Sequence, residues 1–247
     1  DIGGVDINDY PPQIPIDANF QDIPLVTNPP CKVSFIRNWF VIAWDCNQPD
    51  TIARYSQLIQ ILDKEGPTFS LPQIDTLSTN STNSCEVSVT LPYPNNANDN
   101  CTDIDRVDVT YGFNSIPDLQ PGGATVNFPL GSTEVVYRVY DGCLNSTTDT
   151  LMITVIDENV PTVVCRSANV GLNNTAPTRV YAQSFDDGSF DDCGPITLEV
   201  ARMDSACGYD TSFGPFIEVT CCDVADEVMV ILRATDEAGN VNEGMTT

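Results

Sequence analysis

The stretch VVYRVYDGCLN, residues 135–145, decides the fold that we expect for this chain. Its apolar residues are mostly β-branched or aromatic and alternate with others, which is typical of a strand with one buried face. The run ends in an acidic turn, and it returns as WFVIAWDCN at 39–47 and VILRATDEAGN at 230–240. The turn aspartates are 96 and then 95 residues apart. A period this long indicates whole domains in tandem, because each unit can close its own core.

Two further landmarks keep this period. ILDKEGPT at 61–68 returns as VIDENVPT at 155–162, and DNC at 99–101 returns as DDC at 191–193. We therefore expect three repeats, of which the first lacks its front and the third lacks the end of its last strand. Their predicted limits are 1–64, 65–157 and 158–247.

Inside the repeats the hydrophobic period is two, as in strands, and Pro, Gly and Asn turns separate the segments. About seven short strands in about 95 residues predict an all-β fold of antiparallel sandwiches. The expected strands are 85–91, 107–111, 124–128, 134–140, 151–156, 179–182, 196–202, 216–221 and 228–235.

Composition limits the functions that the chain can have. Ten cysteines in 247 residues are typical of an oxidising compartment, so we expect an extracellular or cell-surface protein. The net charge of −25 would repel nucleic acid and anionic lipid, and no apolar stretch is long enough to insert into a membrane. The absence of His removes Ser-His-Asp, Cys-His and imidazole-zinc chemistry, so we expect no enzyme.

The acidic turn at 236–240, the upstream DNC and the closing Val-x-Asp-x-x-x-Pro together resemble hyalin-repeat (HYR) and related immunoglobulin-like modules. The stretch SFDDGSFDDCG at 184–194, with the cysteine pair at 221–222, is similar to tandem modules of giant surface proteins of marine Bacteroidota. The resemblance implies tandem antiparallel immunoglobulin-like β-sandwich domains in an exported adhesin or filament protein. The chain departs from the pattern at Gly244, where such modules often carry Cys, and at Asn47, where they usually carry Gly.

The resemblance implies a structural and adhesive role: a stiff stalk or a multimeric extracellular filament for adhesion or cell capture. The expected partners are further repeats of the same chain, laterally associated copies of it, and surface glycans or proteins of another cell. One alternative is a calcium-dependent module that binds glycan or protein, and another is a non-catalytic spacer of a giant secreted enzyme. We expect lateral association along 31–44, where Trp39 and Trp44 lie on opposite faces of one strand.

The expected strand order suggests disulfides. Loops after the second and sixth strands lie at one end of such a sandwich, so Cys101 and Cys143 are expected to pair. Cys207 is expected to pair with Cys221 or Cys222, since adjacent residues of a strand face opposite ways. The remaining expectations are that Cys31 and Cys46 pair upstream of residue 1, that Cys85 and Cys165 bridge neighbouring repeats, or that Cys165 pairs with Cys193.

Acidic loops at one end of each sandwich are the candidates for metal binding. Calcium takes six to eight oxygen ligands, and a junction between repeats offers several carboxylates at once. No EF-hand spacing occurs, and such carboxylates also cap loops without a metal. No cofactor is required, and the candidate calcium ligands are Asp99, Asp103, Asp141, Asp157, Glu158, Asp186, Asp187, Asp191, Asp192 and Asp236.

The resemblance also implies O-glycosylation. Secreted proteins of Bacteroidota are modified at Asp-(Ser/Thr)-aliphatic sequences, and four stretches match this loose pattern. The candidate residues are Thr51, Thr76, Thr150 and Ser205.

Overall fold

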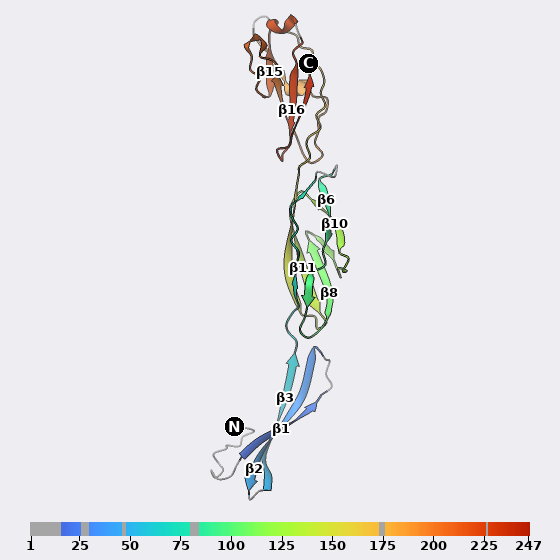
Figure 1. Ribbon diagram of the computed structural model, residues 1–247, viewed down its shortest axis with the longest axis vertical. Helices are drawn as coiled ribbons and strands as arrows, with labels where there is room; N and C mark the ends of the chain where they lie inside the picture. The colour runs from blue at the N-terminus through green and yellow to red at the C-terminus, as the bar shows by residue number, and fades with distance from the viewer. Residues whose placement is uncertain (1–15, 26–29, 46–47, 80–83, 173–175, 226) are drawn as a thin grey trace. The chain divides into compact units, whose positions relative to one another are not determined.

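The computed structural model describes residues 16–25, 30–45, 48–79, 84–172, 176–225 and 227–247. Strands make up almost all of its regular structure, as Figure 1 shows, and the only helices described are three short 3-10 turns. The predicted all-β fold is confirmed. No described helix has the length and apolar character needed to cross a membrane.

The chain forms two compact units, and the boundary between them passes through the second repeat. Each unit contains one of the two junctions between repeats. Unit 1 comprises Asp1–Pro72, Pro92–Gly122 and Val136–Leu151, and unit 2 comprises Gln73–Leu91, Gly123–Val135 and Met152–Thr247.

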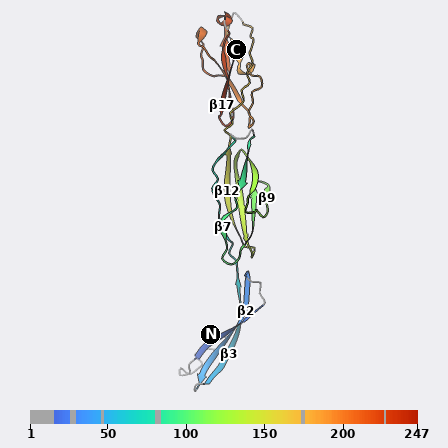
Figure 2. The ribbon, with the colours of Figure 1, turned by 45° about the vertical axis from the view of Figure 1, so that its right-hand side comes forward.

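The first repeat, in unit 1, is a three-stranded antiparallel sheet in the order β1-β2-β3. Its strands are β1 (Ile16–Pro24), β2 (Lys32–Asp45) and β3 (Gln48–Leu62). Trp39 of β2 lies opposite Tyr55 of β3 and Phe20 of β1, and a β-bulge follows Val41. Both Figure 1 and Figure 2 show this sheet in shades of blue.

The second repeat contains a five-stranded sheet in the order β5-β12-β11-β8-β9 and two-stranded sheets β10-β6 and β4-β7. The pairs β10-β6, β4-β7 and β8-β9 are antiparallel, and the short pairing between β5 and β12 is parallel. The strands are β4 (Thr68–Ser70), β5 (Leu77–Ser78), β6 (Glu86–Leu91), β7 (Asn95–Asn98), β8 (Ile104–Tyr111), β9 (Asn114–Ile116), β10 (Ala124–Pro129), β11 (Gly131–Asp141) and β12 (Ser146–Ile156).

The third repeat, in unit 2, is a sandwich of a three-stranded sheet, β14-β16-β17, and a two-stranded sheet, β13-β15. The two sheets contribute Val200, Leu232, Val180 and Ile217 to one buried core. The elements are β13 (Thr178–Tyr181), η2 (Ala182–Ser184), β14 (Thr197–Arg202), η3 (Ala206–Gly208), β15 (Phe216–Val219), η4 (Cys221–Ala225), β16 (Val230–Thr235) and β17 (Val241–Thr246).

The acidic turns end the strands as the repeat pattern predicts. Along β11, Val135, Tyr137, Val139 and Asp141 are fully buried, whereas Arg138 between them is exposed. β16 shows the same alternation. Successive side chains of a strand point to opposite faces, so this period places one row of each strand in a core.

Candidate functional site

The acidic turn is built around one buried aspartate. Asp141 is fully buried, and its Oδ1 accepts hydrogen bonds from the backbone amides of Cys143 (2.7 Å) and Asn145 (2.8 Å). Its Oδ2 accepts one from the Asn145 side chain at 2.9 Å. Asp236 and Asn240 repeat the last two bonds at 2.8 Å each. A buried carboxylate needs such donors, which explains why Asp and Asn recur four residues apart.

The upstream landmark forms a second carboxylate-capped loop. Asp99 Oδ1 accepts hydrogen bonds from the amides of Cys101 and Thr102, each at 2.9 Å, and Asp191 Oδ1 accepts one from the amide of Cys193 at 2.7 Å. Desolvation raises the pKa of Asp99, but the hydrogen bonds from backbone amides and from the Thr102 hydroxyl outweigh it and hold the pKa below its usual value.

The closing landmark supplies a third carboxylate to each junction. Asp63 Oδ1 accepts a hydrogen bond from the Glu65 amide at 3.3 Å, and Asp157 Oδ1 accepts one from the Asn159 amide at 3.0 Å. Asp157 also accepts one from the Thr79 hydroxyl at 3.0 Å. In the first junction, a Cβ added at Gly66 would lie 2.7 Å from the backbone carbon of Ser146, so only glycine allows this close approach.

These landmarks meet where one repeat joins the next. Ligand atoms of Asp63, Asp99 and Cys101 lie within 4.8 Å of one another, as do those of Asp63, Asp141 and Cys143. In the second junction, Asp157, Asp191 and Cys193 form such a group. The Oδ2 atom of Asp63 is buried and has no hydrogen-bond partner among the described residues.

Four of the ten predicted calcium ligands therefore enter these groups: Asp99, Asp141, Asp157 and Asp191. Among the described residues the other six belong to no such group; they are Asp103, Glu158, Asp186, Asp187, Asp192 and Asp236. Asp186 instead caps its own loop through the Ser189 amide at 2.8 Å. Asp63 was outside the predicted set, although its match to Asp157 in the repeat was a signal that could have included it.

Two disulfides join successive repeats. Cys31, beside the start of β2, pairs with Cys143 in the acidic turn of the second repeat, with a Cα–Cα distance of 5.2 Å. Cys85, just before β6, pairs with Cys193 of the third repeat, with a Cα–Cα distance of 5.1 Å. In each bond the first cysteine lies at the end of its repeat that is next to the following repeat. Each junction is therefore linked covalently by a second route besides the chain.

The expected Cys101–Cys143 disulfide was wrong, and so was the expectation that Cys31 pairs upstream. The Asp63 amide donates a hydrogen bond to the Cys31 carbonyl at 3.1 Å, which places Cys31 where β3 leads into the second repeat. There Cys31, rather than Cys101, reaches Cys143. Cys101 is a free thiol whose pKa is raised by desolvation and by nearby carboxylates, those of Asp63 and Asp99 first.

The predictions for the other cysteines are confirmed in part. Cys85 bridges neighbouring repeats, as one expectation held, but its partner is Cys193, so the rival Cys165–Cys193 pair is wrong. Cys165 is a free thiol, and desolvation together with Asp186 raises its pKa. Cys207 pairs with Cys222, one of its two expected partners. The prediction for Cys46 lies outside the described residues.

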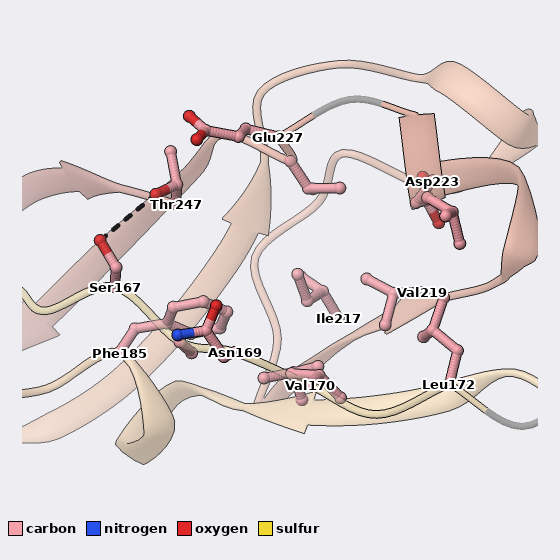
Figure 3. A pocket seen from close by; sticks show the side chains of 14 residues that line it. Ser167, Asn169, Val170, Leu172, Phe185, Ile217, Val219, Asp223, Glu227 and Thr247 are labelled. Atoms are coloured by element: carbon pink, nitrogen blue, oxygen red, sulfur yellow. Dashed lines mark hydrogen bonds between the residues drawn. The ribbon is translucent and has the colours of Figure 1, made fainter.

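The third repeat also has an open cavity of about 670 Å³ at one end of its core (Figure 3). Val180, Phe185, Ile217 and Val219 form much of its wall, and the Ser167 and Thr247 hydroxyls hydrogen-bond at its rim at 3.3 Å. Its lining is largely the core of the sandwich, and it gathers no group of catalytic side chains among the described residues. The four predicted glycosylation residues, Thr51, Thr76, Thr150 and Ser205, are all exposed.

No protein-family model matches the chain, and no curated protein matches it. Among solved structures it is similar to the protocadherin GammaB4 extracellular domain, with 12% identity and a TM-score of 0.38 over 94% of this chain and 42% of that one. Sidekick-1 immunoglobulin domains 1–5 match with 12% identity and a TM-score of 0.36 over 95% and 53%. A three-immunoglobulin segment of titin matches with 11% identity and a TM-score of 0.38 over 95% and 87%. The chain thus spans about half of the first two proteins.

Proposed function

We propose that this chain is a load-bearing segment of a large extracellular surface protein, in which immunoglobulin-like repeats in series form a stalk or filament for adhesion or cell capture. The observation that carries this proposal is the pair of disulfides between successive repeats, Cys31–Cys143 and Cys85–Cys193. A cross-link across a junction does little for the core of either repeat. It does limit how far neighbouring repeats can separate when the chain is pulled.

The two disulfide loops overlap in sequence, so either bond alone limits how far the repeats can separate under tension. The bonds span 112 and 108 residues, and Cys85 lies inside the loop that Cys31 and Cys143 close. Tension between residues 31 and 193 therefore follows one of two short covalent paths. If either bond breaks, the other still bypasses almost the same length of chain. Such redundancy suits a protein that works under tension.

Single-molecule force spectroscopy on the whole chain, pulled from its ends, tests the proposal. Reduction should release 127 hidden residues, 112 behind the junction disulfides and 15 behind Cys207–Cys222, or about 420–460 Å at full extension. The double variant Cys31→Ser/Cys143→Ser should release almost none of this length without reductant, because Cys85–Cys193 still hides 108 residues. Removing Cys207–Cys222, which spans 15 residues, is the matched control and should release about 50 Å. A reductant-independent contour length would overturn the proposal.

Several features support an extracellular setting for this function. Disulfides persist in oxidising compartments, and a net charge of −25 disfavours association with nucleic acid or anionic lipid. In this proposal the partners are further repeats of the chain, laterally associated copies, and glycans or proteins on another cell. The exposed Thr51, Thr76, Thr150 and Ser205 would carry O-glycans, and the function requires no catalytic step.

Calcium binding at the first junction is a second candidate function, and the buried Asp63 Oδ2 favours it. A cation held by Asp63 together with Asp99, or by Asp63 together with Asp141, would satisfy this oxygen and stiffen the junction. Calorimetric titration should then show binding at calcium concentrations up to about 1 mM. Asp63→Asn should abolish it, whereas Asp187→Asn, outside the group, should leave it unchanged. Wild-type protein that binds no calcium in this range would remove the candidate.

A further inference from the structure

Three cysteines gather at the first junction, although a disulfide needs only two. Cys31 and Cys143 are bonded there, and Cys101 lies outside any disulfide. The Sγ atom of Cys101 lies within 4.8 Å of a carboxylate oxygen of Asp63. The Sγ atom of Cys143 lies within the same distance of an oxygen of that carboxylate. One side chain thus has both a thiol and a disulfide sulfur as close neighbours.

The two loops that carry these sulfurs are held against each other inside the second repeat. The backbone amide of Gly142, next to Cys143, donates hydrogen bonds to the Thr102 hydroxyl at 3.0 Å and to the Asp103 carbonyl at 3.1 Å. Thr102 directly follows Cys101 in the chain. These hydrogen bonds belong to one repeat, so they keep the Cys101 loop beside the Cys143 loop independently of the first repeat.

An open cavity gives the Cys101 thiol room to move. Its volume is about 490 Å³, and its lining includes Cys101, Pro30 and Gly142. Pro30 precedes Cys31 and Gly142 precedes Cys143, so the cavity reaches the chain next to both partners of the disulfide. The Cys31 Sγ atom itself lies 3.6 Å from the Gly142 carbonyl oxygen. The Cys101 side chain therefore has space to turn toward the bond without displacing a packed core.

The second junction contains the same kind of bond without a third cysteine. Cys85 and Cys193 are bonded there, and among the described residues no other cysteine joins the group of carboxylates that contains Cys193. Cys165, which also lies outside any disulfide, instead packs beside Gly244 of β17 in the third repeat. The thiol beside a disulfide is therefore a property of the first junction, and the repeat pattern does not require it.

We propose that Cys101 is an exchange partner that moves the bond of Cys143 from the first junction into the second repeat. The Cys101 thiolate attacks the Sγ atom of Cys143, the Cys101–Cys143 bond forms, and the Cys31–Cys143 bond breaks. Cys31 leaves as a thiolate and takes up a proton from water, which replaces the proton that Cys101 lost. One disulfide and one thiol are present before and after the step, so it needs no oxidant and no reductant.

The exchange changes the first junction without breaking the covalent limit on the segment as a whole. After the step, the first repeat is joined to the second through residues 63–67 alone, between β3 and β4. Cys85–Cys193 still bypasses 108 residues and limits the extension between residues 31 and 193. One junction of the proposed stalk can thus loosen while the segment keeps a short covalent path. The inference rests on the proposed function only for this setting.

Thiol mapping of the whole oxidised chain tests this proposal. The chain is incubated without reductant in calcium-free buffer at about pH 9, where an ordinary thiol is largely ionised. Acid then stops the exchange, a maleimide labels the thiols in denaturant, and mass spectrometry of peptides locates the label. Cys31 should gain label as Cys101 loses it, and Cys143 should stay unlabelled. The rate should not depend on protein concentration, because the exchange takes place within one chain.

Cys101→Ser should slow the gain of label at Cys31 at least about tenfold, and alkylation of Cys101 before incubation should do the same without a substitution. Cys165→Ser removes a thiol of the third repeat, so it is the matched control and should leave the gain unchanged. No gain at Cys31 in the wild type, an equal gain in Cys101→Ser, or label at Cys143 instead would overturn the proposal. Each of these results leaves the disulfide-dependent extension under force untouched, so the two proposals fail separately.

Discussion

The two outer repeats carry the same strand pattern in different surroundings. In the third repeat, Val230 and Leu232 of β16 are fully buried because a second sheet shares their core. In the first repeat, β2 ends in the same kind of acidic turn, and its Val41 and Ala43 are buried as well. Trp39 nevertheless stays partly exposed, and Ile61 of the neighbouring β3 is 59% exposed. The alternating pattern fixes which face of a strand is apolar. Whether that face is buried depends on strands outside the pattern.

Two Arg–Asp pairs show the same contrast in electrostatics. Arg202 and Asp223 of the third repeat lie 2.6 Å apart, with side chains 1% and 5% exposed. Arg37 and Asp22 of the first repeat lie 2.8 Å apart, with side chains 25% and 36% exposed. Water screens the Arg37–Asp22 pair but hardly reaches the Arg202–Asp223 pair. The loss of one partner therefore destabilises the third repeat much more than the first.

Asp223→Asn should therefore have the largest effect of any single substitution in this comparison. It removes the buried charged partner of the Arg202 guanidinium and leaves Asp204, which is 48% exposed and 3.5 Å away. The loss of a buried partner costs about 3–5 kcal/mol, and the exposed Asp204 offsets only part of it. The substitution also weakens the hydrogen bond that Asp223 Oδ2 accepts from the Thr220 amide at 2.8 Å. Hydrogen exchange of the amides in β14, β16 and β17, followed by mass spectrometry, measures this local stability.

The control is Asp22→Asn, which should leave exchange in every strand of the third repeat unchanged. Acid supplies an independent readout. The hydrogen bond from Arg202 is the main cause that holds the pKa of Asp223 below its ordinary value, against desolvation. The stability from this pair is therefore present above the ordinary aspartate pKa and is lost as the pH falls through the lowered one. Equal acid sensitivity in wild type and Asp223→Asn would contradict this assignment.

Truncating an isoleucine should likewise cost more stability in the last strand of the second repeat, β12, than in that of the first, β3. Ile153 of β12 is fully buried, and Ile153→Ala should destabilise the second repeat by about 2–5 kcal/mol through the cavity it leaves. Ile61→Ala, on the exposed part of β3, should change the stability of the first repeat by no more than about 0.5 kcal/mol. Hydrogen exchange measures both. A loss of stability after Ile61→Ala as large as that after Ile153→Ala would contradict this contrast.

The strands and turns could be predicted because they depend on local chemistry. A period of two with β-branched residues identified β8, β11 and β16, and the recurrence of Asp141 and Asn145 as Asp236 and Asn240 reflects hydrogen bonds within one turn. The first repeat was less predictable, and its strand β1 was not predicted.

The disulfides show the limit of prediction more sharply. The expected pairing of Cys101 with Cys143 assumed that each repeat staples itself, as an isolated domain would. Cys143 instead pairs with Cys31 of the preceding repeat, and Cys193 pairs with Cys85. A repeat pattern aligns equivalent positions within units, but it contains nothing on which positions meet across a junction. The candidate calcium ligands are less affected, because Asp157 of the second repeat and Asp191 of the third were both predicted and lie in one group.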